Sequence, residues 1–185
     1  METETISNEQ LDEKLYGLLF DVCRSIRYHN RRRAFFDRCD MLNNVVSVVG
    51  GSVAVYGVLE QNIKCVAVFF GGAVTVSSAF GLVVGFSQRA RAHSDFARQY
   101  IELEKKLRKL PPSEELFREV YDARLTIEAE EPPVKRVLDV ICHNDQMRAM
   151  GHPSEEWAHV SILQRWTAQW FDWGDHRLGT SASKK

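Results

Sequence analysis

Two long uncharged runs, residues 41–59 and 65–88, constrain this chain more than any other feature of its sequence. Neither run contains Asp, Glu, Lys or Arg, and only five residues separate them. About 20 helical residues, each rising about 1.5 Å, cross the apolar core of a bilayer. Both runs therefore predict transmembrane helices, and the short connection predicts that they pack together as a hairpin. Two core helices of a soluble protein are the alternative, but such long soluble helices ordinarily carry charge on their outer face.

Basic residues near the runs predict the orientation of the hairpin. Eight arginines flank the outer ends of the two runs, whereas the connection contains only Lys64. Because basic residues stay on the cytoplasmic side of a membrane, this bias predicts a multi-pass protein of the cell inner membrane with both termini cytoplasmic. Contact with anionic membrane lipids is a second, compatible role. The eight are Arg27, Arg31, Arg32, Arg33, Arg38, Arg89, Arg91 and Arg98.

Helical patterns continue from both runs, so residues 1–110 are expected to form one domain. No proline or glycine cluster interrupts residues 8–41, which predicts one helix from about residue 8 into the first run. After the second run, apolar residues recur at spacings of 4, 3, 4 and 3, a coiled-coil pattern. Neighbouring spans would hold the two extensions antiparallel, as a cytoplasmic stalk. The predicted stalk seam is Leu19, Val22, Ile26, Phe96, Tyr100, Leu103, Leu107 and Leu110, and His29 is interpreted as a packing residue at its polar end.

The remaining residues, 111–185, predict a cytoplasmic helical region with a mobile tail. Two double prolines and Gly151 divide it into expected helices from 113 to 131, from 134 to about 150 and from 153 to about 173. All four tryptophans fall in the last of these. Their face could pack on the other helices, bind a partner or another copy, or dock at the membrane interface. The candidate partner surface is Trp166, Trp170 and Trp173.

Small residues recur at helix-packing intervals within both runs. They let helix backbones approach closely in lipid, where no hydrophobic effect drives association. Contacts within the hairpin and between copies are both expected, and any water-filled hole requires a homo-oligomer because one hairpin cannot enclose water. The packing candidates are Ser47, Gly50, Ala54, Gly57, Ser77, Gly81 and Gly85. The candidate conduit-lining residues, which could instead bond backbone carbonyls or neighbouring helices, are Asn43, Asn44, Ser47 and Ser78.

Motifs that would carry chemistry are not recognisable in the sequence. The four cysteines have neither metal-ligand nor disulfide-framework spacing, and there is no glycine-rich phosphate loop or nucleophile elbow. A net charge of −1 argues against nucleic-acid binding. We therefore expect no enzymatic activity, no cofactor and no catalytic, cofactor-binding or metal-binding residues.

The basic and aromatic stretch RYHNRRRAFF at 27–36, the two linked runs and the helical pattern of 88–110 together resemble the SLATT family. These are bacterial two-transmembrane effector domains of nucleotide-signalling conflict systems. The resemblance covers about residues 8–110 and lies in the architecture. It implies an oligomeric pore-forming effector that kills or arrests an infected cell, in antiviral (antiphage) defence.

Residues 111–185 lie outside this resemblance and contain no recognisable nucleotide-sensing domain. A separate cytoplasmic sensor protein is therefore an expected partner. The alternative function is a non-conducting, membrane-anchored scaffold that recruits a cytoplasmic partner through the C-terminal helices. An enzyme anchored by the hairpin is the third and least supported interpretation.

Overall fold

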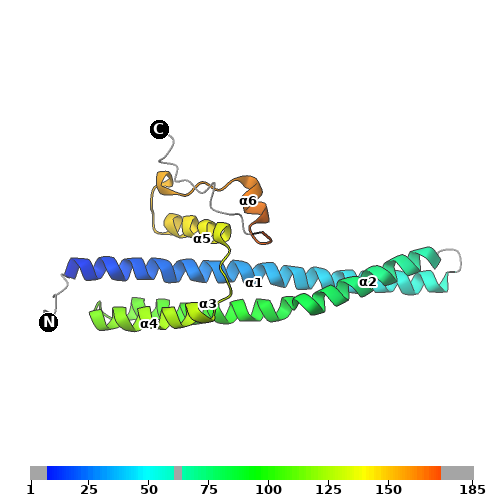
Figure 1. The fold of residues 1–185 in the computed structure, drawn as a ribbon, viewed down its shortest axis with the longest axis horizontal. Coiled ribbons are helices and arrows are strands. Elements are labelled where there is room, and N and C mark those ends of the chain that lie inside the picture. Colours follow the sequence, from blue (N-terminus) through cyan, green and yellow to red (C-terminus); the bar gives the residue numbers. More distant parts are fainter. Residues whose placement is uncertain (1–7, 61–63, 172–185) are drawn as a thin grey trace. The chain divides into compact units, whose positions relative to one another are not determined.

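The computed structural model describes residues 8–60 and 64–171, and the regular elements within them are helices (Figure 1). The predicted all-helical fold class is thus confirmed. In chain order the elements are α1 (Asn8–Leu59), α2 (Lys64–Val84), α3 (Phe86–Lys109), α4 (Glu114–Glu130), α5 (Arg136–Ala149), the 3₁₀ turn η2 (Ser154–Glu156) and α6 (Ile162–Thr167).

The chain divides into two compact units. The apolar unit is Arg32–His93, and the terminal unit combines Met1–Arg31 with Ser94–Lys185. This division differs from the predicted boundary at residue 110, because the later turns of α3 pack with α4 rather than standing apart from the C-terminal region. The first helix contributes residues to both units.

The first predicted helix is confirmed, since α1 runs without a break from Asn8 to Leu59. The second helical stretch is interrupted where α2 ends and α3 begins. Gly85 lies there with a φ of +64°, in the left-handed region that glycine occupies at no steric cost. A glycine that the sequence suggested as a packing residue therefore sets the backbone conformation between two helices.

Three helices form the main core of the terminal unit. Buried side chains of α1, α3 and α4 meet there, and Figure 1 shows α3 and α4 along one side of the first half of α1. The predicted two-helix stalk is thus a three-helix arrangement. The buried residues of this core are Leu18, Val22, Tyr100, Leu103, Leu116, Val120 and Ile127.

A second layer of the terminal unit, made of α5 and α6, covers the other side of the same part of α1 (Figure 1). Tyr28 of α1 packs among Val137, Ile141 and Ala168, and its hydroxyl accepts a hydrogen bond from the Lys135 backbone N–H at 3.0 Å. These contacts join α1 to both α5 and α6. Within the terminal unit, α1 is therefore the central helix.

The prediction of one helix from 153 to about 173 is wrong. The string PSEE occurs twice, but only Ser113 caps a helix, accepting the Leu116 N–H at 3.1 Å. After the 3₁₀ turn, both backbone groups of Ala158 bond the Asn144 side chain, at 2.7 and 2.9 Å. A continuing helix would need those groups for its own hydrogen bonds. The chain becomes helical again only at α6, which Ser161 and Gln164 begin with a capping box.

Candidate functional site

The apolar unit contains the feature with the clearest functional meaning. Both α1 and the α2–α3 stretch are long and apolar enough to cross a membrane, and only 11% and 6% of their most apolar windows are buried. Core helices of soluble proteins are mostly buried, so these exposures argue against that alternative. The outward-facing side chains are large and apolar; Leu82 and Val83, for example, are 84% and 86% exposed.

Small residues bring the two apolar helices close together. A β-carbon at Gly57 would lie 2.9 Å from the Ala67 Cβ and 3.0 Å from its backbone nitrogen, so glycine is required for this approach. A β-carbon at Gly50 would lie 2.7 Å from Val74 Cγ2. Further along, a β-carbon at Gly71 would be 4.0 Å from the Ala54 Cβ, an ordinary contact. Three predicted packing residues of α1, Gly50, Ala54 and Gly57, thus face α2.

Polar side chains complete the same contact face. Ser77 donates to Asn43 Oδ1 at 2.7 Å, and the Ser47 and Ser78 hydroxyls lie 3.3 Å apart. Ser47 also donates to the Asn43 carbonyl at 2.9 Å. Gly81 makes room for this group, since a β-carbon there would meet the Asn43 amide nitrogen at 2.6 Å. These polar side chains therefore form hydrogen bonds with one another across the contact between α1 and α2.

Three of the four candidate conduit residues, Asn43, Ser47 and Ser78, therefore make their contacts within the helix pair. The fourth, Asn44, is exposed and donates to Asp40 at 3.3 Å. Ser52 of α1, another polar residue of the first uncharged run, is also exposed, and its hydroxyl donates to the Val48 carbonyl at 2.9 Å. Within the first uncharged run, the outer surface of α1 thus carries Asn44 and Ser52, eight residues apart.

A basic and aromatic cluster lies within the apolar unit, outside the uncharged runs. The buried Arg32 guanidinium is 4.5 Å from the centre of the buried Phe36 ring, and His93 stacks on that ring at 5.7 Å. Arg89 approaches the same ring at 5.9 Å. Cation–π contacts of this kind are strongest when desolvated. The sequence showed this stretch to be basic and aromatic, and the structure shows that these contacts hold Phe36 against α3.

Most of the predicted stalk seam falls in or beside the three-helix core. Val22, Tyr100 and Leu103 are buried in it, and Ile26, Phe96 and Leu107 pack against it. Leu19 is half-buried, and Leu110 is 43% exposed. The α4 residues of this core were missed, although Leu116, Val120 and Ile127 have helical spacing that could have identified a third core helix.

His29 and Glu131 form a buried pair in the terminal unit. His29 Nε2 and Glu131 Oε1 lie 3.0 Å apart, and the ring stacks on Tyr100 at 5.7 Å. Burial and then the neighbouring Glu131 carboxyl raise the pKa of Tyr100. A cavity of about 370 Å³ adjoins the pair, lined also by Arg24 and the Pro132-Pro133 linker. His29 and Glu131 each have the other as a polar partner at this buried position, which fits the packing role expected for His29.

The tryptophans of the predicted last helix differ in how exposed their side chains are. Trp166 and Trp170 are exposed, at and just after α6. Trp157 follows the 3₁₀ turn and is half-buried beneath Arg148, whose guanidinium is 4.7 Å from its ring. Trp173 lies outside the described residues.

Within residues 8–60 and 64–171, no group of three or more His, Cys, Asp or Glu side chains could hold a metal ion. The four cysteines are free thiols, two of them buried. Comparison of the chain with protein-family models, with curated proteins and with solved structures finds no match.

Proposed function

We propose that this chain is a membrane effector: both apolar helices span the bilayer, the termini are cytoplasmic, and assembled copies permeabilise the membrane on a cytoplasmic signal. Antiphage defence is the setting that the family resemblance implies. The observation that carries the proposal is the exposure of the apolar helices. Side chains such as Leu59, Val68 and Leu82 are more than three-quarters exposed along these helices, and lipid is the solvent that such a surface fits.

Assembly of several copies follows from the contact face of the helix pair. Asn43, Ser47, Ser77 and Ser78 form hydrogen bonds within one chain, so these four side chains are not free to line water in a single copy. The outer face of α1 is different, since Asn44 and Ser52 lie on it with Gly51, where a β-carbon would meet nothing within 4 Å. In our proposal copies join through this face, and Asn44 and Ser52 border the conduit.

Vesicle leakage tests the proposal. Wild-type protein reconstituted with its activating signal should release an entrapped dye and should arrest growth when activated in cells. Gly51→Leu adds a branched side chain to the proposed contact between copies and should abolish both effects. Gly72→Leu is the matched control, because a β-carbon at Gly72 also meets nothing within 4 Å but lies on α2. An activated protein that inserts and never conducts would refute the pore.

A scaffold is the second candidate, and the exposed Trp166 and Trp170 favour it. A scaffold would anchor through the same two helices and bind a cytoplasmic protein through α6. Ion flux separates the two functions, since a scaffold leaves conductance unchanged whether or not Gly51 is replaced. Replacement of Trp166 by alanine would then abolish recruitment of the partner.

A further inference from the structure

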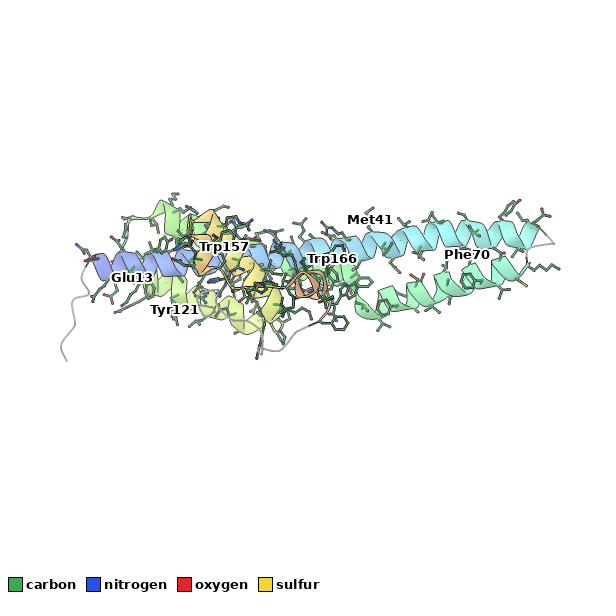
Figure 2. The ribbon with its side chains drawn as sticks, turned by 90° about the horizontal axis from the view of Figure 1, so that it is seen from above. Glu13, Met41, Phe70, Tyr121, Trp157 and Trp166 are labelled. Carbon is green, nitrogen blue, oxygen red and sulfur yellow. The ribbon has the colours of Figure 1, made fainter. Side chains whose placement is uncertain are left out.

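A cluster of large apolar side chains is exposed on and just after α6, and the described residues of the terminal unit leave it uncovered. Trp166 is 80% exposed and is labelled on this helix in Figure 2. Exposed apolar groups gathered on one short segment mark an interaction surface. We call this cluster the α6 patch; its residues are Ile162, Leu163, Trp166, Trp170 and Phe171.

The opposite side of α6 anchors the patch to the rest of the terminal unit. Ala168 is buried in a cluster with Tyr28 and Ile141, and Gln164 is buried within the capping box. Lys135 also donates to the Trp170 carbonyl at 3.2 Å. The helix is thus held by its small and polar residues, and its large apolar residues are left facing outward.

The charge around the patch favours a lipid surface. Residues 157–171 contain no Asp or Glu, although Glu156 and Asp172 flank them in sequence, and α6 itself carries Arg165, which is exposed. Segments that lie at a membrane interface combine basic side chains with Trp, Phe and Leu, and Trp prefers the head-group level. An anionic bilayer surface would attract this segment rather than repel it.

The region that carries the patch packs on a part of α1 that is close to the first uncharged run along the chain. Tyr28 packs with Ala168, which directly follows α6, and Met41, where the first uncharged run begins, comes 13 positions after Tyr28. As helix these residues span about 20 Å. The segment of α1 on which this region packs therefore lies shortly before the first uncharged run along the chain.

We propose that the α6 patch docks into the lipid–water interface of the membrane that holds the apolar helices. This inference rests on the membrane insertion in the proposed function, and not on conductance. Trp166 and Ile162 would enter the region between head groups and acyl chains, while Arg165 contacts lipid phosphates. Docking of α6 gives the terminal unit a second attachment to the bilayer.

Tryptophan fluorescence tests the proposal, and no tryptophan in the apolar runs adds a background signal from within the bilayer. Two single-tryptophan forms of the full chain are made by replacing the other three with phenylalanine, one form keeping Trp166 and the other Trp157. Both are reconstituted in phosphatidylcholine–phosphatidylglycerol vesicles whose acyl chains carry bromine near the head group. We expect bromine to quench Trp166 and to leave Trp157, half-buried beneath Arg148, unaffected.

A charge in the patch provides the second variant. Ile162→Glu in the form that keeps Trp166 should remove the quenching, and Ser161→Thr, which keeps the capping hydroxyl, should not. Resistance to alkaline extraction is measured on every sample, so failure of membrane insertion is recognised separately. Unquenched Trp166 in protein that resists extraction overturns the proposal. Emission that depends on protein concentration and not on bromine overturns it in favour of a second copy on the patch.

Discussion

Replacement of Gly57 by alanine tests whether the apolar helices approach as closely as the structure shows. The new β-carbon would lie 2.9 Å from the Ala67 Cβ, whereas carbon atoms in contact are ordinarily about 3.5–4.0 Å apart. The neighbouring atoms belong to backbone and a β-carbon, so no flexible side chain can move aside. The helices must separate locally by about 1 Å.

The cost of this separation can be isolated by a matched variant. Overpacking a close contact costs about 1–3 kcal/mol, while glycine to alanine in a helix gains up to about 1 kcal/mol. Gly72→Ala makes the same gain in α2 and meets nothing within 4 Å. Comparison of the two variants cancels the gain, so Gly57→Ala should be less stable than Gly72→Ala by about 1–3 kcal/mol.

Dye pairs on the two helices report this difference. In an otherwise cysteine-free background, Tyr56 and Phe69, both exposed, are replaced by cysteines that carry a donor and an acceptor dye. Energy transfer between the dyes then reports separation of the two helices as SDS is added. The equilibrium constants of the two variants should differ by roughly 5- to 150-fold. Equal SDS midpoints would refute the close approach at Gly57, because both variants carry the same propensity change.

Three further predictions concern orientation, the core and pH. A membrane-impermeant maleimide should label Cys65, which is exposed, in intact cells, and Cys65→Ser should remove that signal; labelling only after permeabilisation would reverse the orientation. Val120→Ala should destabilise the terminal unit by about 2 kcal/mol, because it deletes two buried methyl groups, whereas the exposed Leu125→Ala should change thermal stability little. Burial and then the Arg24 charge lower the pKa of His143 in the folded protein. The stability that neutral His143 contributes is therefore present above its pKa in the unfolded chain, about 6.5, and is lost as pH falls through its lower pKa in the folded protein. Denaturation at several pH values should show this loss, and His143→Asn should flatten it.

The sequence predicted best where one physical constraint acts over many residues. Nineteen or more residues without charge can form few structures other than a long apolar helix, and both runs proved helical. Gly50 and Gly57 were also predicted as packing residues, because close approach of two helices requires small side chains. These predictions needed no knowledge of distant parts of the chain.

Predictions failed where a long-range contact decided the local structure. The backbone of Ala158 bonds the side chain of Asn144, and no local pattern reveals that this ends a helix that residues 153–157 could begin. Gly85 was read as one of two glycines four apart, but a spacing does not distinguish a packing glycine from one with positive φ. Asn43 was predicted as a candidate conduit residue, but its side chain accepts a hydrogen bond from Ser77 of α2. The sequence alone does not reveal that these two residues lie opposite each other.

The terminal unit is assembled from the two ends of the chain, with the apolar unit between them, and this order has a consequence during synthesis. Val22 is made about 100 residues before Val120, beside which it is buried in the same core. At 5–20 residues per second, the apolar face of the first helix waits about 5–20 s for its partners. Both apolar helices leave the ribosome during that interval. In the proposed membrane protein, insertion therefore begins before the terminal unit can fold, and the nascent first helix needs protection from aggregation until α4 has been made.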